Sequence, residues 1–394
     1  MVNKNAGILK IFMFKNKDNK KQNKNILVTK FPHESTFGGE EIYTLGLFSA
    51  LQSRGFDFYL LSSCPYFFKK FQNRNWHAKK LNLSKEPLTK LSTIIFLLTA
   101  PYLFFKLLWQ LFYFRFFKKT KILYCLTFGE KILGFIPAKI FGYKIFWVEL
   151  VSPKHWLTKN PLRIFYKLYS KKVKILVPCE HLKNELEECK ITKNNIKIIH
   201  QGIDLEKYKI DEKTLLTNKE YFEVGTVLRL TQEKAAGYLF QALKQTVQIM
   251  PNILLTIVTE QSEKNNLQWL SKQLEIEHLV KIVPLQKDIQ KWFKDFDVFV
   301  MPDKSDFSSM SILEAMACGV AVIADDSCGA SDIIQNSLNG ILTDTSNPEK
   351  ISQALIYLYN NPDKRNQMII EAYKKVAARF TIDKMVGEFI SLLE

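Results

Sequence analysis

The chain is predicted to fold as an α/β protein with two doubly wound domains whose parallel sheets are covered by helices. Short apolar runs of strand length alternate with stretches of helical periodicity, which is typical of parallel sheets with helices on both faces. This alternation occurs twice along the sequence. A chain of 394 residues is also long for one hydrophobic core and comfortable for two. The ligands of such sheets bind beyond the carboxyl ends of the strands, so a cleft between the two domains is expected.

The first predicted domain spans residues 25–205 and follows a flexible extension at residues 1–24. In this extension the apolar start is broken by Lys10, which makes it a poor signal peptide, and a Lys/Asn run typical of a solvated tail follows. The strands expected in this domain are 26–31, 57–62, 122–126, 144–149, 174–178 and 196–200. Helical periodicity is clearest at 39–54 and 181–189.

The second predicted domain spans residues 206–375, and a polar linker from Gly202 to Asn218 marks the boundary. The strands expected in it are 222–230, 253–259, 280–285, 298–301, 320–324 and 340–343. The helices expected between them are 235–250, 263–276, 309–318 and 349–360. A helical tail closes the chain and has a break near Phe380.

The cysteines and the net charge indicate the compartment of the protein and the kind of partner that it binds. The six cysteines show neither a CxxC pair nor metal-ligand spacing with histidine, so we expect buried free thiols in a reducing cytosol and no zinc. The net charge is +17, but residues 1–205 carry an excess of 22 positive charges and the remainder an excess of 5 negative ones. A basic first half fits a polyanionic partner, either anionic lipid or nucleic acid. No nucleic-acid recognition motif accompanies the charge, which favours lipid.

Residues 91–117 form a segment dense in Phe, Leu, Trp and Tyr. A spanning helix needs about 20 predominantly apolar residues. Here Pro101 interrupts the longest uncharged stretch and Lys106 stands near the middle of any segment of that length. We therefore expect an interfacial helix or hairpin whose apolar face docks on lipid while flanking lysines contact head groups. The alternative is a buried helix pair of the first domain.

The most specific motif runs Ser-Asp-Phe-Ser-Ser-Met-Ser-Ile-Leu-Glu-Ala-Met-Ala-Cys-Gly and ends at Gly319. Two carboxylates, Asp306 and Glu314, bracket a small polar turn. The turn holds three good N-cap residues, Ser308, Ser309 and Ser311. The turn should therefore open a helix whose free N–H groups can hold a phosphate. A carboxylate beside such a helix start is expected to accept hydrogen bonds from hydroxyls of a sugar or ribose attached to that phosphate.

This motif resembles the donor-site motif of the retaining GT-B glycosyltransferases of family four, the group 1 glycosyl transferases. The family pattern is an acid, seven residues, a Glu and then Ala-Met-Ala-x-Gly. The first acid is usually Glu, and Asp306 is similar to a branch with Asp, although Phe307 stands where that branch usually has Gly. The resemblance implies a GT-B fold, two Rossmann-like domains facing a cleft, with residues 376–394 forming a helix that returns to the first domain.

The resemblance also implies roles for the residues of the motif. Glu314 would grip the ribose and Asp306 would contact hydroxyls of the donor sugar. The diphosphate would lie at the helix start, which is formed by Ser308, Ser309, Met310 and Ser311.

Two further segments resemble elements of the family that surround the diphosphate. Gly38 and Gly39 match its Gly-Gly loop after the first strand, where paired glycines let the backbone approach a ligand. Arg229 and Lys234 match its cationic pair, and fixed cations stabilise a leaving diphosphate without a metal. The family's Gly after this Lys is Ala235 here, so the loop is expected to be slightly reshaped.

The candidates for contact with the acceptor are His33, Glu149 and His155. His33 lies close to the Gly-Gly loop in sequence. Many family members have a His near the end of the strand that here ends in Glu149, and His155 follows a few residues later. Glu149 is therefore either a sugar contact or a structural carboxylate, and the sequence leaves both open.

Two other segments are expected to be structural. Gly202 lies in a stretch that resembles the family's hinge and is expected to serve backbone geometry. Asp295 and Asp297 form a DxD pattern that elsewhere binds a metal, but the pattern leads straight into strand 298–301. A structural role is therefore expected for it, and no metal.

The resemblance thus implies a retaining, metal-independent glycosyltransferase that uses a nucleotide-diphosphate sugar and needs no bound cofactor. The expected acceptor is lipid-linked or a glycan, in the synthesis of a cell-surface polysaccharide or glycolipid. The expected location is cytoplasmic, peripherally on the inner face of the plasma membrane, with no nucleic-acid partner. Two rivals remain: a GT-B relative with other chemistry on a nucleotide sugar, such as epimerisation or hydrolysis, and a catalytically inactive membrane-surface scaffold.

Overall fold

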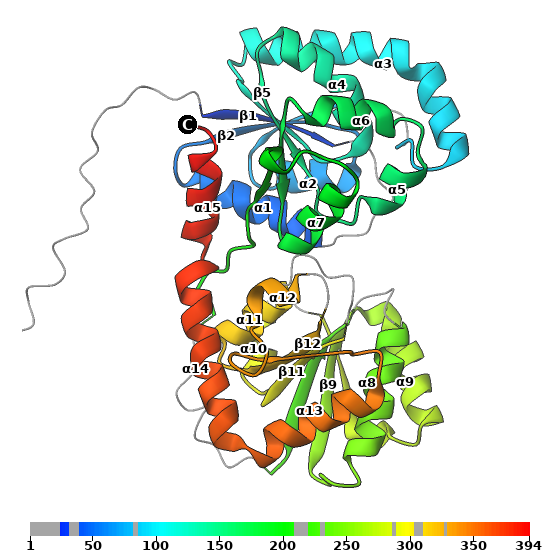
Figure 1. Ribbon diagram of the computed structural model, residues 1–394, viewed down its shortest axis with the longest axis vertical. Helices are drawn as coiled ribbons and strands as arrows, with labels where there is room; N and C mark the ends of the chain where they lie inside the picture. The colour runs from blue at the N-terminus through cyan, green and yellow to red at the C-terminus, as the bar shows by residue number, and fades with distance from the viewer. Residues whose placement is uncertain are drawn as a thin grey trace, which may run out of the picture.

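The computed structural model describes residues 24–30, 39–81, 86–208, 220–228, 233–285, 289–302, 310–326 and 329–394. The side chains of His155, Trp156, Glu233 and Lys234 lie outside this description. The described residues form two parallel sheets, of seven and six strands, each with helices packed on both faces (Figure 1). The predicted fold class, two Rossmann-like doubly wound domains, is confirmed.

The sheet of the N-terminal domain has the order β3-β2-β1-β4-β5-β6-β7, and all its neighbours pair in parallel. Its strands are β1 (Asn25–Lys30), β2 (Asp57–Ser62), β3 (His77–Lys80), β4 (Ile122–Cys125), β5 (Lys144–Val148), β6 (Lys174–Val177) and β7 (Ile196–Ile198). Successive side chains of a strand point to opposite faces of the sheet. In β1, Leu27 therefore packs into one core while Ile26 and Val28 pack into the other.

The helices of this domain divide between the two faces. They are α1 (Gly39–Gln52), α2 (Pro65–Gln72), α3 (Lys90–Phe116), α4 (Phe128–Ile140), α5 (Lys154–Lys159), α6 (Arg163–Ser170) and α7 (Glu180–Glu188). Helices α3 to α7 pack on the face that holds Leu27. Helices α1 and α2 pack on the opposite face, where the C-terminal helix α15 (Ile382–Ser391) joins them.

The sheet of the C-terminal domain has the order β10-β9-β8-β11-β12-β13 and is also parallel. Its strands are β8 (Phe222–Val227), β9 (Ile253–Thr259), β10 (Val280–Pro284), β11 (Val298–Met301), β12 (Ala321–Asp325) and β13 (Ile341–Thr343). Its helices are α8 (Glu233–Thr246), α9 (Lys264–Gln273), α10 (Gln290–Phe293), α11 (Met310–Ala317), α12 (Ala330–Ile333), α13 (Pro348–Asn360) and α14 (Pro362–Arg379). Helices α8, α9 and α13 cover one face, while α10, α11 and α12 cover the other.

Every predicted strand is present, with ends shifted by no more than three residues. Strand β3 was not predicted, because its sequence His-Ala-Lys-Lys is polar and mostly exposed at the edge of the sheet. Its strand conformation comes from pairing with β2, where Tyr59 lies opposite His77. The five described cysteines are buried and free, as predicted, while Cys328 lies outside the described residues.

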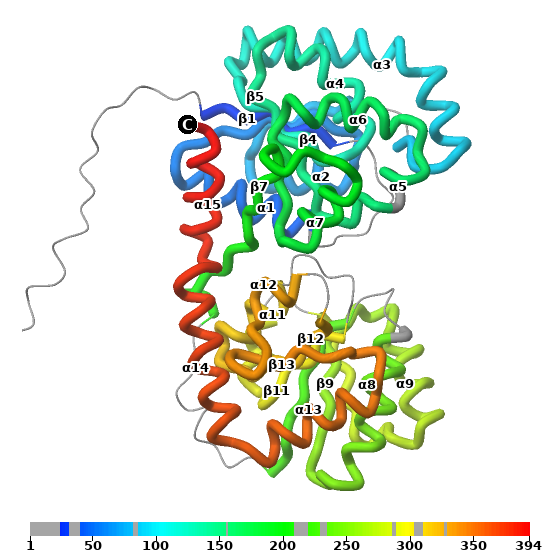
Figure 2. The backbone as a smooth tube through the Cα atoms, viewed as in Figure 1, coloured from blue at the N-terminus to red at the C-terminus, as the bar shows by residue number. Residues whose placement is uncertain are grey.

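Two segments that lie side by side connect the domains (Figure 2). Ile203 donates its N–H to the carbonyl of Phe380 at 2.8 Å and accepts from the N–H of Ile382 at 3.2 Å. A side chain at Gly202 would place its Cβ 2.7 Å from the carbonyl oxygen of Thr381. Glycine is thus required here for close approach of the tail. The predicted break near Phe380 is confirmed, since α14 ends at Arg379 and α15 begins at Ile382.

The apolar segment predicted at 91–117 is one long helix, α3, which is bent and lies across the N-terminal domain (Figure 1). By length and composition α3 could cross a membrane, and 22% of its most apolar window is buried. Residues along its whole length, from Phe96 to Phe114, pack into the core of the domain. Crossing a bilayer would break these contacts, so in this fold α3 lies on the domain surface.

Candidate functional site

The candidate site lies where the two domains approach each other, beyond the carboxyl ends of the strands. Helices α11 and α12 lie on the side of the C-terminal domain that faces α1 and α7 (Figure 1). Asp332 on α12 accepts the backbone N–H of Glu180 at 2.7 Å, and Nε2 of His200 lies 3.6 Å from the same carboxylate oxygen. The domains are therefore in direct contact beside the site.

Glu314 is placed by α11, which begins at Met310 as the serine-rich turn predicted. Its side chain is buried, 8% exposed, and the hydroxyl of Tyr208 donates to Oε1 at 2.6 Å. Burial and the neighbouring Glu314 carboxylate raise the pKa of Tyr208 well above its usual range, so the phenol stays protonated and remains a donor. Tyr208 thus fixes one oxygen of Glu314, a contact that the sequence did not reveal.

Several predicted site residues lie outside the described residues. They are His33, Gly38, Arg229, Asp306, Ser308 and Ser309. Lys234 is the second residue of α8 and His155 the second of α5, but nothing is described of their side chains. Of the predicted diphosphate contacts, Gly39 is the first residue of α1, while Met310 and Ser311 are the first two of α11. These three therefore sit at helix starts, as expected.

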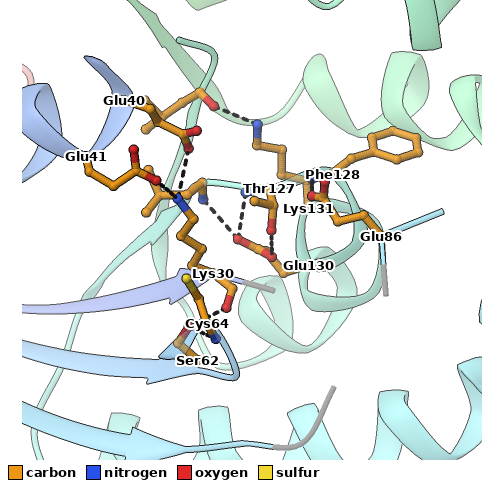
Figure 3. Close-up of polar contacts among 12 residues, drawn as sticks. Lys30, Glu40, Glu41, Ser62, Cys64, Glu86, Thr127, Phe128, Glu130 and Lys131 are labelled. Carbon is orange, nitrogen blue, oxygen red and sulfur yellow. Dashed lines mark hydrogen bonds and ion pairs between the residues drawn. The ribbon is translucent and has the colours of Figure 1, made fainter. Parts of the chain in front are cut away.

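The structure adds a buried charge cluster at the carboxyl end of β1 (Figure 3). The Nζ atom of Lys30 donates to Glu41 at 2.8 Å and lies 3.6 Å from Glu40. Lys30 is fully buried, and burial alone would lower its pKa, but the carboxylates of Glu40 and Glu41 outweigh this and raise the pKa. The cluster ties the first turn of α1 to the sheet. The one feature of the sequence that could have indicated this cluster was a lysine at the end of an apolar strand.

Glu149 is a partner of a second buried lysine. Lys131 on α4 donates to Oε1 of Glu149 at 2.5 Å and to the carbonyl of Val148 at 2.7 Å. The hydroxyl of Tyr166 donates to the same Oε1 at 2.7 Å. Burial raises the pKa of Glu149 although the ammonium of Lys131 opposes the shift. With 4% of its surface exposed, Glu149 is held at the end of β5 by Lys131 and Tyr166.

Glu130 precedes Lys131 and lies in the first turn of α4 (Figure 3). Its Oε1 accepts the backbone N–H groups of Leu126 at 3.0 Å and Thr127 at 2.8 Å, and its Oε2 accepts from the Thr127 hydroxyl. This is a capping box at the start of a helix. Burial raises the pKa of Glu130 to about 8, because the hydrogen bonds from Thr127 recover only part of the lost hydration.

The DxD pattern has the predicted structural role. Asp297 accepts the backbone N–H of Glu223 at 2.9 Å and donates its own N–H to the Glu223 carbonyl at 2.8 Å. It therefore joins the amino ends of β8 and β11, at the edge of the sheet opposite the carboxyl ends. In the described residues no group of three or more His, Cys, Asp or Glu side chains is arranged to hold a metal ion.

Comparisons with known proteins were made for the sequence and for the fold. Residues 207–375 match the family model described as "Glycosyl transferases group 1". An uncharacterized glycosyltransferase of Haemophilus influenzae is 28% identical over 221 residues, which are 56% of this chain and 61% of that relative. The match thus spans about three fifths of that protein's length.

Two further relatives cover more of the chain. The UDP-Gal:alpha-D-GlcNAc-diphosphoundecaprenol alpha-1,3-galactosyltransferase of Escherichia coli is 24% identical over 303 residues, 71% of this chain and 77% of that protein. The crystal structure of Anabaena HepE in complex with UDP superposes with a TM-score of 0.74 at 17% identity, covering 94% of this chain and 99% of that one. The fold is therefore the GT-B fold of glycosyltransferase structures.

Proposed function

We propose that this chain, whose residues 207–375 match the model of the group 1 glycosyl transferases, is a retaining glycosyltransferase that uses a nucleotide-diphosphate sugar. The observation that carries the proposal is Glu314, a buried carboxylate near the start of α11 that Tyr208 holds in place. A carboxylate accepts hydrogen bonds from the two hydroxyls of a ribose. Its position within the matched domain, close to a helix start, suits a ribose joined to a diphosphate.

In this proposal the remaining predicted residues contact different parts of the donor, either its diphosphate or its sugar. Arg229 and Lys234 neutralise the diphosphate, which gains negative charge as it leaves, so the reaction needs no metal ion. The helix starts at Gly39 and at Met310–Ser311 present backbone N–H groups to the same phosphates. Asp306 contacts hydroxyls of the sugar. Closure of the domains about Gly202 would exclude water and limit hydrolysis of the donor.

The proposed acceptor is presented at an anionic membrane surface, and α3 supports this. Its large apolar side chains recur every three or four residues from Leu91 to Trp109 and again at Phe116, along one exposed face, which we call the outer face of α3. They are Leu91, Ile95, Leu98, Tyr102, Phe105, Trp109 and Phe116. Leu98 is 78% exposed, and contiguous exposed apolar surface marks an interaction site.

Basic residues lie around the outer face of α3. Those that are exposed include Lys90 at its first turn and Lys118, Lys119 and Lys121 after its last turn. An apolar face flanked by lysines matches the chemistry of an anionic bilayer, with apolar side chains at the acyl boundary and ammonium groups on the head groups. We propose peripheral attachment at the cytoplasmic face through this surface, in the synthesis of a cell-surface polysaccharide or glycolipid.

A thermal-shift screen of the purified chain in detergent tests the function. UDP-sugars come first, since the HepE structure holds UDP, and GDP-, ADP- and dTDP-sugars follow. A donor that binds the folded state raises the Tm by mass action. We expect one nucleotide class to raise the Tm and Glu314→Ala to abolish the shift. Tyr208→Phe should weaken donor binding about tenfold, because a hydrogen bond to a charged group contributes roughly 1.5–3 kcal/mol.

The opposite result is equally informative. If circular dichroism shows both variants folded and no nucleotide sugar shifts the wild-type Tm, the proposed function is wrong and the inactive scaffold replaces it. If Glu314→Ala keeps the full shift, donor binding is real but Glu314 is not part of it.

A further inference from the structure

A pocket of about 470 Å³ opens at the first turns of α3, in the N-terminal domain. Pockets that hold small ligands have volumes of roughly 300–1,000 Å³. Its apolar walls come from Leu88, Ile94 and Leu97 on one side and Pro161 on the other. A mostly apolar pocket of this size suits part of a hydrocarbon chain.

Two lysines lie at the rim of this pocket. Lys90 comes from the first residue of α3 and Lys159 from the last residue of α5, and both are exposed. Neither is a member of the ion pairs found among the described residues. Apolar walls with two cations at the mouth fit an amphiphile whose apolar chain ends in an anionic group.

The pocket is connected to the outer face of α3. Leu97 lines the pocket and is 51% exposed, and Ile94 lines it and is 56% exposed. Leu98, the next residue on the helix, belongs to the outer face and does not line the pocket. An apolar chain leaving a bilayer at α3 would therefore reach the pocket without crossing polar surface.

The pocket is also connected to the candidate site. Leu88, in its wall, follows Glu86 by two residues, and Glu86 accepts the backbone N–H of Phe128 at 2.9 Å (Figure 3). Phe128 begins α4 at the carboxyl end of β4, beside the capping carboxylate of Glu130. Between these points, the carbonyl of Pro87 accepts a hydrogen bond from Thr93 in the pocket wall at 3.2 Å. The short segment from Glu86 to Leu88 thus links the pocket to the sheet edge that carries the site.

We propose that this pocket holds the apolar chain of a lipid-linked acceptor, and that Lys90 and Lys159 contact the phosphate or diphosphate that joins this chain to its glycan. The inference rests on the proposed function and narrows it, because it selects a lipid-linked acceptor over a free glycan. A glycan attached beyond the phosphate would extend from the pocket mouth along the Glu86–Leu88 segment to the donor.

Binding of farnesyl phosphate to the full chain, measured by calorimetry below the micelle concentration, tests the inference. We expect it to bind, farnesol to bind more weakly and inorganic phosphate not to bind. Leu97→Trp should weaken binding at least about tenfold, because the indole fills the pocket. The matched control is Leu98→Trp, which makes the same change one residue outside the pocket and should leave the affinity unchanged.

The two lysines are tested against a control variant that loses the same number of positive charges. The double variant Lys90→Gln/Lys159→Gln should weaken farnesyl phosphate but not farnesol, whereas Lys118→Gln/Lys121→Gln at the far end of α3 should change neither. Equal affinity of wild type and Leu97→Trp would overturn the inference. It would also be overturned if soluble dihexanoyl phosphatidylglycerol bound as tightly and with the same dependence on Leu97, since the pocket would then hold a bilayer phospholipid.

The same variants separate this inference from the proposed function. Donor binding is read from the Tm shift with nucleotide sugars, and Leu97→Trp should retain it. A wild type that binds farnesyl phosphate but no nucleotide sugar would overturn the glycosyltransferase function and leave the lipid pocket standing. A wild type that binds a nucleotide sugar but not farnesyl phosphate would leave the glycosyltransferase function standing and overturn the lipid-linked acceptor.

Discussion

At the scale of single residues, the site edge of the N-terminal domain is held by lysines that are buried with carboxylate partners. An unpaired buried charge is strongly unfavourable, and removing one member of a buried pair costs roughly 3–5 kcal/mol. Lys30 with Glu41 fixes the start of α1, and Lys131 with Glu149 fixes the end of β5. These pairs set the positions of the backbone around the site, so their side chains are already engaged within the protein.

The buried carboxyl of Glu130 predicts a pH dependence of stability. Its pKa is raised from 4.5 to about 8 in the folded chain, so between these values the folded state keeps a proton that the unfolded state has released. The free energy of unfolding contributed by Glu130 therefore falls as pH rises from about 4.5 to 8. Glu130→Gln removes this dependence, and its amide N–H can donate to the Thr127 hydroxyl, which reverses the direction of the present hydrogen bond. We expect the Tm of the variant, relative to wild type, to increase across this range.

The measurement is the difference in Tm between the two proteins at pH 5, 6, 7 and 8, which cancels all other titrating groups. Each kcal/mol of relieved cost should appear as roughly 2–4 °C if the N-terminal domain, which holds Glu130, unfolds as one unit. Two Tm curves that stay parallel across this range would mean that the N–H groups of Leu126 and Thr127 offset the cost of burial and that the pKa of Glu130 is not raised.

At the scale of elements, most strands could be predicted because buried parallel strands are continuous apolar runs. Strand β3 could not, since its polar sequence becomes a strand only by pairing with β2. Helix α11 was predicted from candidate N-cap serines, of which Ser308 and Ser309 lie outside the described residues, and Glu314 lies on this helix. The partner Tyr208 was not predicted, because it lies 106 residues away in sequence and no local pattern connects the two. The contacts of Lys131 were not predicted for the same reason, because its partners are also distant in sequence.

The two faces of α3 lead to a prediction about membranes. The sequence alone left open whether this segment docks on lipid or packs in the core. In the structure, one apolar face of α3 packs in the core and the other is exposed. We expect the chain to co-sediment with vesicles of phosphatidylcholine that contain about 30% phosphatidylglycerol, and less so at high salt. Leu98→Gln/Phe105→Gln should reduce binding several-fold, since both side chains are exposed on the outer face and would lose apolar contact with lipid.

A control of matched exposure is available in the other domain. Ile249 and Trp269 are 62% and 64% exposed but belong to the C-terminal domain. The variant Ile249→Gln/Trp269→Gln should therefore bind vesicles as the wild type does. If both double variants lost vesicle binding equally, the attachment would be unspecific and the outer face of α3 would not be the docking surface.

At the scale of the whole molecule, the C-terminal tail makes the two domains interdependent. After α14 the chain passes Gly202 and adds α15 to the core of the N-terminal domain. Phe389 is fully buried there, with ring centroids 5.5 Å from Phe146 and 6.3 Å from Tyr124. The N-terminal core is thus completed by the last residues of the chain, an arrangement that favours hinge motion about the paired connections over separation of the domains.

Phe389→Ala should therefore destabilise the N-terminal domain selectively. Truncation of a buried phenylalanine to alanine costs roughly 3–5 kcal/mol. We expect a lower unfolding midpoint and faster proteolytic cleavage near Thr381, because α15 would detach more often from α1. The donor-induced rise in Tm should become smaller but persist, since the contact proposed for Gly39 would be weakened while Glu314 and Tyr208 lie in the other domain.

Lys384→Ala supplies the control, because Lys384 is exposed on the same helix. This substitution should leave both the midpoint and the cleavage rate close to wild type. If Phe389→Ala were cleaved no faster than Lys384→Ala, the tail would be held by contacts other than its buried face. Loss of donor binding in Phe389→Ala alone would mean instead that the position of the N-terminal domain is itself required to form the donor site, as expected if the phosphates contact α1 and α11 together.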